Sequence, residues 1–138
     1  MSLFLPLKRA TLLVPSSPDY DLGRKHLFIL LTDPICDQSG RMSVLMVSLS
    51  SVKPGIPYDS TCILKQGDHP FIRQESYVQY ARARIEDPNK LLRGVKAGTL
   101  IPFDPMVQNI FARICSGLEI SLFTSPVIQQ FYRNLLSG

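Results

Sequence analysis

Two nearly unbroken apolar runs constrain the fold of this chain more than any other feature. The first, Lys25–Thr32, is almost wholly apolar between its ends and is bounded by Gly23 and by Asp33–Pro34. The second, Met42–Ser51, follows the turn formers of Asp37–Gly40 and becomes polar at its end. Short apolar runs between turn signals are typical of buried strands. We therefore expect two central strands that pair antiparallel.

Shorter segments indicate further strands around this pair. Residues 8–14 and 60–64 are rich in β-branched and apolar side chains, and residues 76–85 alternate between apolar and polar side chains. Residues 15–23 and 53–59 hold prolines and other turn formers, so they are expected to be loops. The serines at the end of Met42–Ser51 either cap the strand through local backbone hydrogen bonds or offer hydroxyls to a ligand.

The C-terminal third predicts two amphipathic helices, at about 104–118 and 125–137. Asp104–Pro105 and Ser125–Pro126 each supply a capping side chain followed by proline, a combination that favours a helix start. Apolar residues recur after both at helical spacing. Residues 91–103 hold two glycines and are expected to be irregular.

These elements predict an α+β fold: a small antiparallel barrel over about residues 8–103, with about five to six strands, covered by the two helices. With 138 residues, 45% hydrophobic and 19% charged, the chain is expected to be one globular domain, residues 1–138. It shows no internal repeat, and its apolar runs are too short to cross a bilayer.

The cysteines, the opening residues and the net charge limit the classes of function that this chain could have. Cys36, Cys62 and Cys115 have neither C-x-x-C spacing nor a histidine at ligand spacing, so we expect buried free thiols and no metal site. The opening residues 1–9 place their apolar run before their positive charges, unlike a secretory signal, which favours the cytoplasm. A net charge of +4 raises the odds of a nucleic-acid or acidic protein partner.

The stretch Lys65–Tyr77 concentrates the side chains best suited to chemistry. In an extended backbone Arg73 and Glu75 project from the same face about 6.5–7 Å apart. A guanidinium binds phosphate oxygens, a neighbouring carboxylate orients it or accepts a proton, and His69 supplies an acid or base. Such a set suits phosphodiester cleavage without a metal. The alternative is that Arg73 and Glu75 form a surface ion pair with no catalytic role and that His69 shapes a turn. His26, at a strand end, is expected to be structural.

The chain resembles the PemK/MazF-like toxins of toxin–antitoxin systems. Residues 23–34 and 44–51 look like that family's strand, loop and strand that ends in hydroxyl side chains, and Ile72–Glu75 looks like its arginine-x-acid strand. Residues 15–23 fall where the family has a loop between its first strands. Ser50 stands where the family has threonine, Glu75 where it has aspartate, and Lys25–His26 where it has arginine–proline.

The resemblance implies an SH3-like barrel, usually dimeric, that cuts single-stranded RNA through a 2′,3′-cyclic phosphate without metal or cofactor. Carried over by position, Arg73 would stabilise phosphate charge, Glu75 would act as base or orient the arginine, and Ser50 would donate a hydrogen bond. His69 would be an additional acid or base. An acidic antitoxin would be the protein partner, with no role for a membrane.

Two functions from other classes stay open. A noncatalytic barrel would bind nucleic acid or a protein partner without cleaving RNA. An interaction protein would instead use its C-terminal helices, with exposed Phe131 and Tyr132 as part of the binding face.

Overall fold

The computed structural model describes residues 4–15, 25–37 and 39–137 of the chain. Most of the expected loop at 15–23 lies outside these residues. The strands are β1 (Thr11–Pro15), β2 (Lys25–Leu30), β3 (Ile35–Cys36), β4 (Met42–Ser51), β5 (Ile63–Leu64), β6 (Ser76–Val78), β7 (Arg84–Glu86) and β8 (Ile101–Phe103). The helices are the 3-10 helix η1 (Tyr80–Arg82), α1 (Pro88–Ala97), α2 (Gln108–Ile120) and α3 (Pro126–Ser137).

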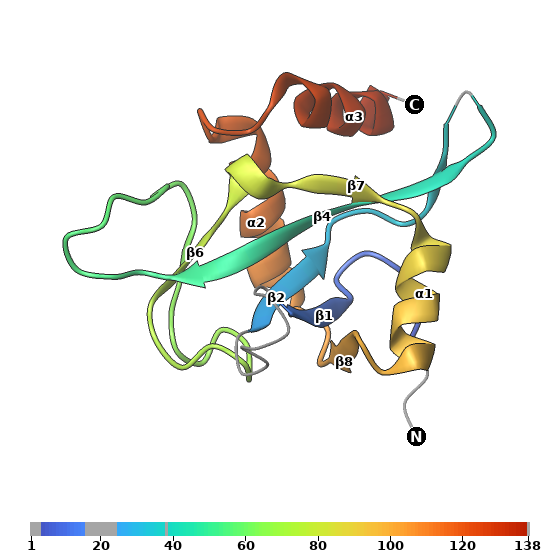
Figure 1. Cartoon of the computed structure of the whole chain (residues 1–138). Helices are drawn as coiled ribbons and strands as arrows, with labels where there is room; N and C mark the ends of the chain where they lie inside the picture. The colour runs from blue at the N-terminus through green and yellow to red at the C-terminus, as the bar shows by residue number, and fades with distance from the viewer. Residues whose placement is uncertain (1–3, 16–24, 38, 138) are drawn as a thin grey trace.

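The eight strands of the described residues form one antiparallel sheet, in the order β5-β6-β4-β2-β1-β8, with β3 and β7 also paired to β4. β4 is the longest strand and runs across the whole molecule, with α2 behind it (Figure 1). The expected antiparallel pairing of the two apolar runs is confirmed, since Phe28 of β2 pairs with Ser48 of β4. The mixed sheet and helix architecture is confirmed as well. The sheet is open. It holds more strands than expected because residues 76–86 form two strands, β6 and β7, and because β3 and β8 lie where no strand was expected.

Both faces of the central strands are covered, which explains why these strands are apolar at almost every position. The odd-numbered side chains of β2 and β4 pack against α2 and α3, in a core that includes Leu27, Val47 and Ile114. The even-numbered side chains form a second core with Leu91 of α1, for example Phe28 and Met46. Alternate residues of a strand point to opposite faces, so a strand between two cores needs apolar residues in both sets.

The expected strand over 76–85 is interrupted by η1. β6 and β7 both pair with β4, but the chain turns out of the ladder between them. Tyr80, in this turn, is fully buried, and its hydroxyl donates a hydrogen bond to the carbonyl of Ile114 on α2 at 2.7 Å. Burial raises the pKa of Tyr80, so the phenol stays a donor at physiological pH. The interruption therefore brings the tyrosine ring into the core.

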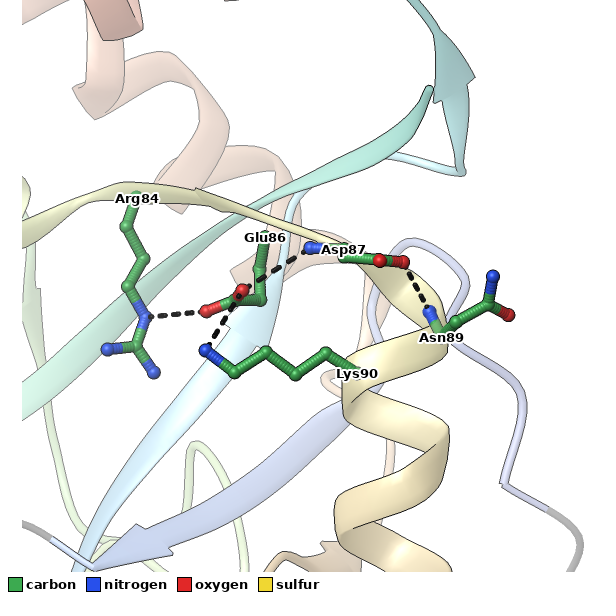
Figure 2. A network of polar contacts seen from close by, with 5 residues as sticks. All are labelled: Arg84, Glu86, Asp87, Asn89 and Lys90. Carbon is green, nitrogen blue, oxygen red and sulfur yellow. Dashed lines mark hydrogen bonds and ion pairs between the residues drawn. The ribbon is translucent and has the colours of Figure 1, made fainter. Parts of the chain in front are cut away.

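Helix α1 replaces the irregular region expected at residues 91–103. It begins with Asp87–Pro88, in which the Asp87 carboxylate accepts a hydrogen bond from the backbone N–H of Asn89 at 2.8 Å (Figure 2). It ends at Gly98, which has the left-handed conformation that glycine favours at this position. The signal at its start is the same aspartate–proline pair used to predict the next helix.

Helix α2 begins at Gln108, later than the expected start at Asp104–Pro105. The carbonyl oxygen of Asp104 accepts hydrogen bonds from the Thr11 hydroxyl at 2.7 Å and from His69 Nε2 at 2.6 Å. An N-cap carbonyl must instead accept a bond from the helix. Tertiary contacts therefore hold Asp104 outside the helix. The expected helix at 125–137 is confirmed as α3, with the hydroxyl of Ser125 accepting a hydrogen bond from the Ile128 N–H.

Candidate functional site

The polar end of β4 lies beside the segment that the sequence singled out. Ser50 pairs with Tyr77 of β6, and Ser51 pairs with Ser76. The Val52 N–H then donates a hydrogen bond to the carbonyl of Glu75 at 2.9 Å, which extends the same register by one residue. Ser50 of β4 and Glu75, the residue just before β6, thus lie two residues apart along this register.

Arg73 and Glu75 precede β6 rather than lying within it. Pro70 and Phe71 lie in a turn, Gln74 lies in a bend, and β6 begins only at Ser76, so the expectation that both side chains share a strand face is wrong. Both side chains are exposed, and no ion pair among the described residues includes either of them. Arg73 lines a shallow cavity of about 480 Å³ together with Gly67, His69 and neighbouring residues. A guanidinium free of ion pairs within the described part of the chain can bind an anion at this cavity.

His69 is 2% exposed, and both of its ring nitrogens are engaged. Nδ1 accepts a hydrogen bond from the Phe71 N–H at 3.1 Å, so it carries no proton, and Nε2–H donates to the carbonyl of Asp104 at 2.6 Å. The ring also lies 5.5 Å from the ring of Phe103. This geometry is that of a structural histidine that ties the β5–β6 connection to the β8–α2 connection.

A set of polar side chains, of which the sequence identified only Ser50 as a site residue, lies on the other side of the sheet from α2. We call it the polar face: His26, Ser48, Ser50, Tyr77 and Gln79. The Ser48 hydroxyl donates to the side-chain oxygen of Gln79 at 2.8 Å, and His26 Nδ1 lies 2.9 Å from the carbonyl of Leu49. Ser50 and Tyr77 join them because side chains alternate between faces and their neighbours Leu49 and Val78 belong to the α2 core. The change from apolar to polar residues at alternate positions of β4 was the available signal.

Aromatic and cationic groups border the polar face. The rings of Tyr58 and Tyr77 lie 5.3 Å apart, and Tyr58 is 39% exposed. At the α1 end of the same face, the guanidinium of Arg84 lies 4.6 Å from the centre of the Phe28 ring. Arg84 also pairs with Glu86 at 3.8 Å, and Lys90 pairs with the same carboxylate at 3.5 Å (Figure 2). These contacts hold the Arg84 cation over the sheet.

The cysteines divide into two environments. Burial raises the pKa of the Cys62 thiol, although the positive charge of Arg113 acts in the opposite direction, and burial also raises the pKa of Cys115. Protonated thiols are poor nucleophiles, so neither residue is a candidate for covalent catalysis. Cys36 is exposed, which corrects the expectation that all three thiols are buried. Across the described ranges, no group of three or more His, Cys, Asp or Glu side chains is arranged to hold a metal ion.

Comparison with known proteins assigns no family to the chain. No protein-family model matches it, and no curated protein or solved structure is significantly similar to it. In the part of the chain that the structure describes, no helix has the length and apolar character needed to span a membrane. Phe131 and Tyr132 pack against the α2 core and keep part of their surface exposed.

Proposed function

We propose that this protein is a PemK/MazF-like toxin, an endoribonuclease that cleaves single-stranded RNA without a metal ion. The observation that supports it best is the continuous register from Ser50–Tyr77 to Val52–Glu75. It brings a hydroxyl donor on β4 near an exposed carboxylate, with the exposed cation of Arg73 two residues earlier in the chain. We infer that the open sheet corresponds to the SH3-like barrel of that family.

In this reaction Glu75 accepts the proton of a ribose 2′-hydroxyl, and the 2′-oxygen attacks the adjacent phosphorus. The bond from phosphorus to the 5′-oxygen breaks, which leaves a 2′,3′-cyclic phosphate and a 5′-hydroxyl that takes up a proton. Arg73 binds the phosphate oxygens as negative charge develops, and Ser50 donates a hydrogen bond to one of them. Electrostatic stabilisation of this kind is commonly the largest contribution to rate enhancement.

The test compares purified wild-type protein with Arg73→Ala and Glu75→Gln on end-labelled single-stranded RNA. Each substitution should lower the cleavage rate by about 100-fold or more. Arg93→Ala removes an exposed arginine of α1 and should leave the rate unchanged, which controls for the loss of one positive charge. Equal cleavage by Arg73→Ala, Glu75→Gln and wild type would overturn the assignment.

The proposed partners are an acidic antitoxin and a second copy of the chain. The net charge of +4 supports an acidic partner, and a neighbouring reading frame that encodes a small protein with an acidic tail would support the toxin assignment. Apolar side chains of the turn between α2 and α3 are well exposed, with Leu122 at 95% and Phe123 at 60%. Exposed apolar patches commonly mark protein interfaces, and light scattering would give the oligomeric state.

A second candidate function is noncatalytic binding of single-stranded nucleic acid. The aromatic pair of exposed Tyr58 and partly buried Tyr77, with Arg84 on the same face, favours it because bases stack on aromatic rings while cations bind the backbone. Such a protein would bind labelled RNA with an affinity that falls as salt rises, yet release no cyclic-phosphate ends.

A further inference from the structure

The two histidines of this chain are held in opposite ways. His69 uses both ring nitrogens in hydrogen bonds to the backbone and is almost fully buried. His26 is only partly buried, and its Nδ1 lies 2.9 Å from the carbonyl of Leu49. A carbonyl only accepts, so Nδ1 carries the proton and Nε2 holds the lone pair in the neutral ring. Within the described residues, no hydrogen bond involves Nε2.

His26 also lies where the proposed reaction needs a second proton-transfer group. The β2–β4 register pairs Phe28 with Ser48, and its continuation sets His26 opposite Ser50. Ser50 pairs on its other side with Tyr77. β4 therefore lies between the strand of His26 and the strand that follows Glu75, with about 10 Å separating these two outer strands. A phosphate at Ser50 would have His26 on one side and Glu75 on the other.

We propose that His26 is the general acid of this reaction, an inference that rests on the proposed ribonuclease function. Protonated Nε2 donates its proton to the 5′-oxygen as the bond from phosphorus to that oxygen breaks, while Glu75 has taken the proton of the 2′-hydroxyl. Solvent then returns the proton from Glu75 to His26. The hydrogen bond to Leu49 fixes the ring orientation, as second-sphere partners do for other catalytic histidines.

Few charged groups on the described strands face His26. Its β1 partner is Val14 and its β4 neighbours are Ser48 and Ser50, none of which carries a charge. Arg84 of β7 lies over Phe28, two residues along β2, and its charge is offset by Glu86. Tyr77 of β6, and Glu75 two residues before it, are the next titratable groups. A bound phosphate would supply the negative charge that stabilises an imidazolium ring.

The test substitutes each histidine by the amide that keeps its structural hydrogen bond. In His26→Asn the side-chain amide can still donate to the Leu49 carbonyl, but no group takes the place of Nε2. We expect its cleavage rate to fall by about 100-fold or more, and the dependence of the rate on pH between about 5 and 8 to flatten. In His69→Gln the amide can still donate to the Asp104 carbonyl, and the shape of the pH profile should stay that of wild type.

The outcomes separate this inference from the proposed function. A wild-type protein that cleaves RNA beside an equally active His26→Asn, with an unchanged pH profile, would overturn the role of His26 and leave the ribonuclease assignment standing. If the pH dependence of the cleavage rate flattened only in His69→Gln, the role of general acid would belong to His69 instead. A wild-type protein that releases no cyclic-phosphate ends would overturn both proposals. Urea unfolding of both variants would detect a fold change.

Discussion

Gly117 of α2 lies directly against Tyr80, the residue that interrupts the β6–β7 edge. A Cβ atom at this position would collide with the tyrosine hydroxyl and would stand 2.7 Å from Cζ of the ring. Tyr80 has no room to move because it is fully buried and bonded to Ile114. We expect Gly117→Ala to lower the free energy of unfolding by about 1–3 kcal/mol, measured by urea denaturation.

Ser116→Ala, one residue earlier at an exposed position of α2, is the matched control and should change stability by less than about 0.5 kcal/mol. The double variant Gly117→Ala with Tyr80→Phe should lose less stability than the sum of the single changes, because the clashing oxygen is gone. Strict additivity would contradict the close approach.

Asp59 joins the β4–β5 loop to the end of α2. Burial raises the pKa of its carboxyl, but hydrogen bonds from the hydroxyls of Ser121 and Thr61 and from the Thr61 N–H outweigh burial and lower it. The unfolded chain then binds a proton at higher pH than the folded chain does, so this contribution to stability is lost as pH falls through the folded-state pKa.

The prediction is that Asp59→Asn loses less stability than wild type between about pH 6 and pH 3. Urea midpoints at both pH values would measure it. Glu119→Gln, which replaces an exposed carboxyl of α2 by an amide, is the matched control. If Asp59→Asn also matched wild type, the hydrogen bonds to Asp59 would not contribute to acid sensitivity.

At the scale of elements, α1 depends on its N-cap. The Asp87 carboxylate accepts a hydrogen bond from the Asn89 N–H (Figure 2). Leu91 of the same helix packs into the second core against β4. Asp87→Ala should cost about 1 kcal/mol of folding free energy, while Asp87→Ser, which keeps a capping oxygen, should cost much less. Thermal or urea unfolding would measure both. Equal losses would mean that the cap contributes little.

The elements also show which predictions local sequence can support. The two apolar runs became β2 and β4 with the expected pairing, and Ser125–Pro126 starts α3, since strand hydrophobicity and helix caps are properties of neighbouring residues. The same aspartate–proline signal starts α1 at Asp87 but fails at Asp104, whose carbonyl is bound by Thr11 and His69. That difference is set by contacts distant in the sequence.

For the molecule as a whole, His69 connects segments that are 35 residues apart in the chain through its bond to Asp104. His69→Ala leaves the Phe71 N–H and the Asp104 carbonyl without the imidazole partner, so we expect a loss of about 1–3 kcal/mol in urea unfolding. His69→Gln should recover part of this loss because its amide can donate to the same carbonyl. If His69→Ala and His69→Gln lost the same stability, the structural role of His69 would be contradicted.

The candidate site also has a part that the sequence predicted and a part that only the fold revealed. The family resemblance grouped Arg73, Glu75 and Ser50 in one site, and the β4–β6 register places Glu75, just before β6, beside the end of β4. Arg73 and Glu75 do not share a strand face, because the chain turns before Ser76. The polar face was missed because His26, Ser48 and Tyr77 come from three separate strands.

By itself the sequence determined the two central strands, their antiparallel pairing and the helix at the C-terminus, because apolar patterning and capping act over a few residues. Only the tertiary structure decided where α2 begins, where the edge strand breaks at Tyr80, and which histidine is buried. Each of these depends on a hydrogen-bond partner more than 30 residues away, as between Tyr80 and Ile114 or His69 and Asp104. A partner of that kind leaves no local pattern to read, which is why His69 stood out in the sequence and His26 in the fold.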